Sequence, residues 1–212
     1  MRVLGWLAVL GVAVGFAAGL AWAPREATQG EVQRIMYVHV PAVWVAYLAF
    51  GVVFVASVAY LWQRGAAADR LAHAAAEAGT LFLGLNIATG AIWGKPTWGT
   101  WWTWDARLTL TLMLFFIFIG YQLLRGAVTD PALRARYAAV VGICGLVLLP
   151  FIHLSVYLFR TLHPQPIVLK PSAPSAPPEM VTTLLLAVGV FILLYVGFVV
   201  QRYALGGEGR DA

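Results

Sequence analysis

The 212-residue sequence has a single cysteine and few charged side chains. One cysteine, Cys144, excludes an intrachain disulfide and an iron–sulfur or zinc centre built on clustered thiolates. We interpret Cys144 as a small buried residue within an apolar run. Charged residues make up 11% of the chain, too few to coat a soluble protein of this length, whereas 61% of residues are hydrophobic. The composition therefore predicts a membrane protein.

Six apolar runs approach or exceed the roughly 18 to 20 residues that cross a bilayer as a helix, and none alternates like a barrel strand. They cover about residues 4–22, 40–62, 78–93, 108–124, 138–159 and 180–203. The third run is the weakest because Asn86 and Thr89 interrupt it. The connections, about a dozen to twenty residues each, leave no room for a separate soluble domain. We expect an all-α polytopic membrane protein, one domain over residues 1–212 with six transmembrane helices.

The charge distribution indicates an orientation and excludes one class of partner. The net charge is +5, and the arginines are scattered, so a nucleic-acid surface is not expected. The side with the termini and the even-numbered loops carries eight Lys and Arg residues against six on the other. This positive-inside bias predicts cytoplasmic termini and three odd-numbered loops outside. The first run, with Arg2 before it and Ala21-Trp22-Ala23 at its end, has a cleaved signal peptide as its alternative interpretation.

Five of the nine tryptophans fall within twelve positions of the third loop. They are Trp93, Trp98, Trp101, Trp102 and Trp104. One interpretation is an interfacial aromatic belt, although a belt usually spreads over several helix ends. If residues 97–105 are helical, Trp98, Trp101 and Trp102 line one face together with Asp105. Such a tryptophan shelf would suit a large, planar, apolar ligand, and we favour this interpretation.

Three ionisable residues accompany the tryptophans. Asp105 precedes the fourth apolar run, where it could cap the helix N-terminus or have a direct role in the site. Lys95 and Arg107 flank the tryptophans and could pair with ligand carboxylates or with lipid headgroups.

Two of the four histidines are expected on the same membrane face as the tryptophans. His39 precedes Pro41, which is tolerated in the first turn of a helix and predicts that the second span begins nearby. His163 follows the fifth run and also falls in an odd-numbered loop. Two imidazoles facing each other across a planar aromatic ligand is the arrangement that holds a six-coordinate haem.

The other two histidines have simpler interpretations. His153 lies inside the fifth span, roughly 10 Å below its outer end at 1.5 Å per residue, so we do not expect it at the level of His39 and His163. A structural role between helices is favoured over a role in haem binding. His73 is expected to be a solvated residue of an inner loop.

Three motifs together resemble a known family. Residues 37–42 read Tyr-Val-His-Val-Pro-Ala, residues 93–109 contain Trp-Gly-Thr-Trp-Trp-Thr-Trp-Asp, and residues 152–155 read Ile-His-Leu-Ser. The tryptophan segment resembles the WWD motif of membrane haem-handling proteins. The three motifs and the six-span plan are similar, across nearly the whole chain, to the haem exporter protein C (CcmC) family of cytochrome c-type biogenesis.

The resemblance implies a function and a set of partners. It implies that His39 and His163 are the axial ligands of the iron of haem b, held non-covalently and transiently, and that the tryptophan loop cradles the exposed haem edge. It further implies a carrier rather than an enzyme, in the cell inner membrane. The haem would pass to the periplasmic haem chaperone CcmE, with CcmA, CcmB and CcmD as subunits of an ABC transporter complex.

The sequence departs from the family pattern at two places. Leu158-Phe159 stands where a tryptophan pair is expected before the motif Thr161-Leu162-His163. The fifth loop also carries six prolines, which predict an extended, polyproline-like path. These are Pro164, Pro166, Pro171, Pro174, Pro177 and Pro178.

From the sequence we predict that haem b docks against the tryptophan shelf with its iron between His39 and His163. Four cations are candidates for its propionates, and the sequence does not rank them. They are Lys95, Arg107, Arg25 and Arg34. The chain has no Cys-x-x-Cys-His motif, which indicates that it does not hold haem by thioether bonds.

Two alternative functions fit the sequence less well. A cytochrome b-like electron-transfer subunit usually needs two haems with paired histidines inside the spans, and only His153 is expected there. A small-solute transporter would place polar features near the bilayer midplane, where only Asn86, Thr89 and His153 qualify.

Overall fold

The structure is a computed structural model that describes residues 2–168 and 170–208. This part of the chain contains six α-helices, one 3₁₀ helix and no strand, which confirms the predicted all-α fold. The elements are α1 (Arg2–Trp22), the 3₁₀ helix η1 (Glu31–Ile35), α2 (Met36–Gln63), α3 (Ala66–Trp98), α4 (Ala106–Ala127), α5 (Pro131–Leu158) and α6 (Pro178–Glu208).

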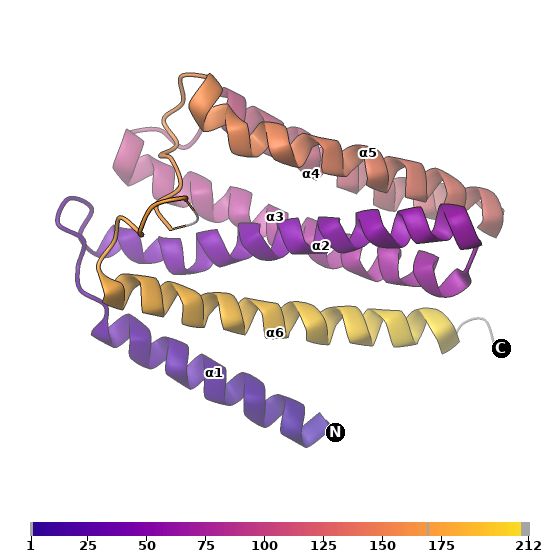
Figure 1. Cartoon of the computed structure of the whole chain (residues 1–212), viewed down its shortest axis with the longest axis horizontal. Helices are drawn as coiled ribbons and strands as arrows, with labels where there is room; N and C mark the ends of the chain where they lie inside the picture. Colours follow the sequence, from indigo (N-terminus) through magenta and orange to yellow (C-terminus); the bar gives the residue numbers. More distant parts are fainter. Residues whose placement is uncertain (1, 169, 209–212) are drawn as a thin grey trace.

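The helices run up and down, so the connections separate onto two ends of the bundle (Figure 1). The first loop with η1, the third loop (99–105) and the fifth loop between α5 and α6 lie at one end, which we call the loop end. Short turns join α2 to α3 and α4 to α5 at the opposite end. Helices α2 to α6 are each long and apolar enough to cross a membrane, and α1 contains a shorter apolar segment, Val9–Trp22.

The helices extend beyond the apolar runs that the sequence suggested. The third run was expected at 78–93, but α3 occupies 66–98, and the connections on either side of α3 and α4 are much shorter than a dozen residues. The reason is that hydropathy marks only the apolar part of a helix. The segment 66–78 is rich in alanine, which favours a helix even where Asp, Arg, His and Glu interrupt the apolar pattern.

Side chains and backbone conformation fix two helix ends near the tryptophans. Asp105 is the N-cap of α4, since its Oδ1 accepts a hydrogen bond of 3.0 Å from the Leu108 amide, which confirms the capping interpretation. Helix α3 ends at Gly99, whose φ of 79° is the left-handed conformation that glycine adopts without steric cost. Residues 97 and 98 belong to α3 but residues 99–105 are not helical, so the condition on which the single tryptophan face depended is not met.

Helices α2 and α3 approach each other closely because small residues lie between them. A Cβ atom on Gly79 of α3 would come within 2.7 Å of the Phe50 ring of α2. Ala42, Ala46 and Ala49 of α2 are fully buried. In a membrane, where lipid is as apolar as a leucine side chain, such close backbone approach is a main source of helix association.

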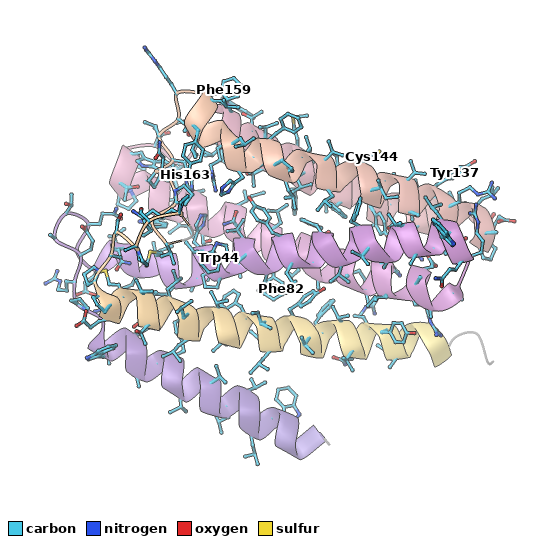
Figure 2. All side chains as sticks on the ribbon, viewed as in Figure 1. Trp44, Phe82, Tyr137, Cys144, Phe159 and His163 are labelled. Carbon is cyan, nitrogen blue, oxygen red and sulfur yellow. The ribbon has the colours of Figure 1, made fainter. Side chains whose placement is uncertain are left out.

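Helices α5 and α1 both contribute to the exterior of the bundle. Cys144 lies exposed on α5, so its interpretation as a buried residue was wrong (Figure 2). Helix α1 packs along α6, where the Thr183 hydroxyl donates a hydrogen bond of 3.0 Å to the Gly19 carbonyl oxygen.

A buried ion pair ties α3 to α4 at the end opposite the loop end. The Arg125 guanidinium bonds to both carboxylate oxygens of Asp69 at 2.6 and 3.0 Å, and the two side chains are 8% and 6% exposed. About two turns along α3 from Asp69, Glu77 bonds to Arg202 of α6 and lies 3.5 Å from His73. His73 is therefore a residue of α3 facing an acidic partner, which corrects its interpretation as a solvated loop residue.

We predict that Asp69→Ala destabilises the protein by about 3–5 kcal/mol, because it leaves a buried guanidinium without its counter-charge. The double variant Asp69→Leu, Arg125→Met should recover most of this loss. Thermal unfolding in detergent, followed by size-exclusion chromatography, measures both. Arg136→Met, on an exposed position of α5, serves as the control. Equal melting temperatures for Asp69→Ala and the unmodified protein would contradict the prediction.

Candidate functional site: a cavity between two histidines

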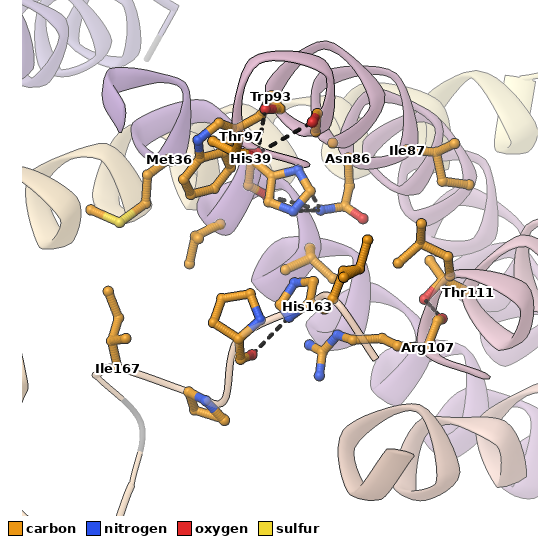
Figure 3. A pocket seen from close by; sticks show the side chains of 18 of the residues that line it. Met36, His39, Asn86, Ile87, Trp93, Thr97, Arg107, Thr111, His163 and Ile167 are labelled. Atoms are coloured by element: carbon orange, nitrogen blue, oxygen red, sulfur yellow. Dashed lines mark hydrogen bonds between the residues drawn. The ribbon is translucent and has the colours of Figure 1, made fainter. Parts of the chain in front are cut away.

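A cavity of about 410 Å³ opens at the loop end of the bundle, within the usual size range of a ligand pocket. Helices α2 to α6 and the fifth loop all contribute to its wall. His39 of α2 and His163 of the fifth loop both line it, with Arg107 of α4 beside them (Figure 3). The structure thus brings together two histidines that are 124 residues apart in the sequence.

His39 lies within the second span rather than before its start. Helix α2 begins at Met36, directly after η1, so Pro41 is the sixth residue of the helix instead of marking its first turn. The correction leaves His39 near the loop end of α2. It also adds a preceding turn of helix whose apolar residues, Met36 and Tyr37, are buried.

The hydrogen bonds around His39 favour one tautomer of its ring. Its Nδ1 lies 3.2 Å from the Thr89 hydroxyl oxygen of α3, and that hydroxyl donates its own proton to the Leu85 carbonyl oxygen at 2.7 Å. The Thr89 oxygen therefore accepts a proton from His39 Nδ1. This tautomer places the ring lone pair on His39 Nε2, the nitrogen that could bind a metal, and the Asn86 amide nitrogen lies 3.2 Å from it.

Two further residues of α3 fix the position of His39. The Asn86 amide nitrogen donates to the His39 carbonyl oxygen at 3.1 Å and lies 3.2 Å from both ring nitrogens. Gly90 faces the ring so closely that a Cβ atom there would come within 2.9 Å of His39 Cε1. The Trp93 ring meets the imidazole edge-on at 5.7 Å between centroids.

The hydrogen-bond partners of His163 are neighbouring residues of the fifth loop. Its Nδ1 lies 2.8 Å from the Pro164 carbonyl oxygen, which can only accept, so Nδ1 carries the proton and Nε2 carries the lone pair. Its backbone amide donates to the Thr161 hydroxyl at 3.1 Å. Burial, assisted by the positive charge of Arg107, lowers the pKa of the His163 imidazole below its ordinary value, so the ring is neutral near pH 7.

The fifth loop does not follow the extended path that its prolines suggested. The Ser175 amide donates to the Ile167 carbonyl oxygen at 2.9 Å, so the chain turns back on itself between these residues. Val168 packs against the core cluster that contains Leu184 of α6. Phe159, one of the two residues that depart from the family pattern, is 58% exposed and points away from the bundle (Figure 2).

The tryptophans divide into two groups instead of forming one shelf. Trp93, Trp98 and Trp102 line the cavity, and the Trp98 ring meets His163 edge-on at 6.4 Å between centroids. Trp101 and Trp104 do not line it and are 57% and 76% exposed. The turn at Gly99 causes this separation, because it ends the helical spacing on which the predicted shelf depended.

The geometry ranks the candidate cations. Arg107 lines the cavity, and its Nη1 is buried without a hydrogen-bond partner among the described residues. Lys95 donates to the Gly99 carbonyl oxygen and lies outside the cavity wall. Arg25 and Arg34 both pair with Glu31. Arg107 is thus the cation placed to meet an anionic group inside the cavity.

Some cavity residues were not anticipated. His153 of α5 lines the same cavity as the other two histidines, so the expectation that their depth separates them was wrong. Tyr47 and Thr111 also line it, from α2 and α4. Tyr47 lies eight residues after His39 and so projects from the same face of α2, which is the sequence signal that would have indicated it.

The cavity does not have the ligands of a simple metal site. The described residues contain no group of three or more His, Cys, Asp or Glu side chains that could hold a metal ion. The cavity is instead lined by three imidazoles, by four indoles, those of Trp44, Trp93, Trp98 and Trp102, and by the Arg107 guanidinium. These groups suit a flat, apolar molecule that brings its own metal ion and carries a negative group.

Comparisons with known proteins agree with this chemistry. A family model described as Heme exporter protein C matches residues 1–206. The chain is 40% identical over 212 residues to Heme exporter protein C of Haemophilus influenzae, covering 98% of this chain and 84% of that protein. It is 41% identical over 198 residues to the protein of the same name in Bradyrhizobium diazoefficiens, covering 92% and 75%. A putative cytochrome c biosynthesis ccmC-like mitochondrial protein of Marchantia polymorpha is 40% identical over 141 residues, covering 66% and 59%.

Proposed function

Since the chain belongs to the Heme exporter protein C family, we propose that it binds haem b in the cavity at the loop end and passes it to a partner for cytochrome c biogenesis. The observation that carries this proposal is that His39 and His163 line one cavity, each with Nδ1 within hydrogen-bond distance of an oxygen and the ring lone pair on Nε2. We assign the two Nε2 atoms as the axial ligands of the haem iron.

The fit of haem to this cavity rests on shape and charge. The indoles of Trp93, Trp98 and Trp102 present apolar rings to a planar macrocycle at little cost in side-chain entropy. Arg107 supplies a buried guanidinium that would bond to a haem propionate, and its unpartnered Nη1 is the donor for that bond. The bound haem is the cargo, held by coordination and packing without a covalent link.

Transfer of the haem to an acceptor requires that part of the bound haem be accessible from outside the cavity. Trp101 and Trp104 stand exposed on the third loop, next to Trp102 at the cavity wall, and the Trp102 and Trp104 rings meet edge-on. We propose that these exposed indoles cover the outer haem edge and contact the acceptor. In this account the protein is a carrier, and its reaction is ligand exchange at the iron.

The proposed function also implies an orientation in the membrane and a set of partner proteins. We propose that the loop end faces the periplasm and that the helices cross the inner membrane with cytoplasmic termini, in line with the positive-inside bias. The periplasmic chaperone CcmE would receive the haem, and CcmA, CcmB and CcmD would complete the transporter complex. All three odd-numbered loops lie at the loop end, which allows one acceptor to reach the histidines and the tryptophans together.

The histidine placement favours a carrier over an electron-transfer subunit. A transmembrane redox chain needs a second haem site toward the other side of the bilayer. His73, near that end, lies 3.5 Å from Glu77, and the other three histidines of the sequence all line the cavity at the loop end.

We predict that His39→Ala and His163→Ala each abolish the low-spin, six-coordinate spectrum of the purified protein, because each removes one axial ligand. Absorption and electron paramagnetic resonance spectra in detergent measure this change. His73→Ala is the matched control and should leave the spectra as they are. Unchanged low-spin spectra in both cavity variants would refute the ligand assignment.

We predict that Arg107→Gln weakens haem binding by about 10- to 100-fold, which corresponds to the loss of about 1.5–3 kcal/mol for a hydrogen bond to a charged group. Lys95→Gln should change the affinity by less than about twofold, since an exposed charge contributes little. Haem titration of the two purified variants compares them. An equal loss in both would show that the cavity guanidinium has no special role.

We predict that the two groups of tryptophans have separable effects. Trp98→Ala should lower the amount of haem retained, because this ring contacts His163 in the cavity. Trp101→Ala and Trp104→Ala should retain haem but transfer it more slowly to purified acceptor chaperone. Haem content and stopped-flow transfer rates measure the two effects, and the reverse pattern would contradict the prediction.

A further inference from the structure

The two histidines of the cavity are supported in different ways. The polar partners of His39 lie on a different helix, 47 and 50 residues away in the sequence. The polar partners of His163 lie within two residues of it. This difference bears on how a ligand held between them would leave.

The support of His39 is part of the packing between α2 and α3. Thr89 fixes the tautomer, Asn86 holds both the backbone and the ring, and Gly90 leaves just enough room for the imidazole. Moving His39 away from the cavity would separate α2 from α3 where small residues bring them into contact. Among the element pairs of the bundle, these two helices share the most extensive packing.

The support of His163 ends within its own loop. Its ring bonds to the Pro164 carbonyl oxygen, and none of the hydrogen bonds of the described chain joins that ring to a helix. Its nearest aromatic neighbour, Trp98, meets it only edge-on. A change in the backbone torsions around residues 159–164 would swing the imidazole out of the cavity while every helix stays in place.

We propose that His39 is the anchor ligand, which retains the haem, and that His163 is the exchangeable ligand, which leaves first during transfer. This inference rests on the proposed function. In the exchange, the bond between iron and His163 Nε2 breaks and a bond forms between iron and a Lewis base of the acceptor, such as an imidazole nitrogen or a phenol oxygen. The iron keeps its oxidation state, and the neutral imidazole of His163 leaves without a proton.

The same geometry assigns Thr89, Asn86 and Gly90 as positioning residues. Thr89 does not line the cavity, so it acts on the cargo only through His39. Because the Thr89 hydroxyl accepts a hydrogen bond from Nδ1–H, it raises the basicity of His39 Nε2 and orients its lone pair for bonding to iron.

Replacing each histidine by glycine tests the order of release. Without added ligand, His163→Gly should retain haem in a high-spin, five-coordinate form, and added imidazole should restore the low-spin spectrum. His39→Gly should retain about tenfold less haem than His163→Gly, in the range seen when a ligand or its support is lost. Circular dichroism and size-exclusion chromatography establish that both variants are folded.

The outcomes of this experiment separate the two proposals. An equal loss of haem in both variants, or a greater loss in His163→Gly, would overturn the anchor assignment while leaving both histidines as ligands. A low-spin spectrum that persists in both variants without imidazole would refute the assignment of His39 and His163 as ligands in the proposed function.

A second comparison tests Thr89 without touching either ligand. Thr89→Val keeps the shape of the side chain but removes the acceptor for Nδ1, and we expect it to speed haem loss to excess apomyoglobin by about tenfold. Thr89→Ser should restore the original rate and the original g-values of the low-spin iron. Thr161→Val, the matched change beside His163, should alter the rate by less than twofold. Equal effects of Thr89→Val and Thr161→Val would contradict unequal support of the two ligands.

Discussion

The close contact between α2 and α3 is the constraint on which the cavity depends. His39 comes from α2, whereas the groups that orient it, Thr89, Asn86 and Gly90, come from α3. Small residues along both helices allow this approach, with Gly79 against Phe50 as its tightest point. The helix association that stabilises the bundle in lipid therefore also fixes the position and the tautomer of one imidazole.

Arg125 and Arg107, near opposite ends of the bundle, differ in how their guanidinium groups are partnered. At the end with the short turns, the buried guanidinium of Arg125 is matched by Asp69 through two hydrogen bonds. At the loop end, the guanidinium of Arg107 keeps a buried nitrogen without a partner in the described chain. Burying a charge is costly unless a partner satisfies it, and the proposed haem propionate would supply that partner for Arg107.

The sequence predicted the helices and the grouping of the site residues better than their local geometry. Apolar runs identify membrane helices because lipid requires them, and the odd-numbered loops do lie at one end, where His39 and the cavity tryptophans also meet His163. The helical shelf failed at Gly99, since a single positive φ ended α3 and divided the tryptophans. The depth of His153 and the partners of the four cations depend on how the helices tilt and pack. The spacing of apolar residues in the sequence does not determine that tilt or packing. The roles of individual residues in haem binding stay predictions.

A structure of the protein purified with its haem is the most direct test of the central claim. The account predicts iron bonded to Nε2 of both His39 and His163, with a propionate on the Arg107 guanidinium. Haem bound at any place other than this cavity, or iron coordinated by a residue other than these two histidines, would contradict it.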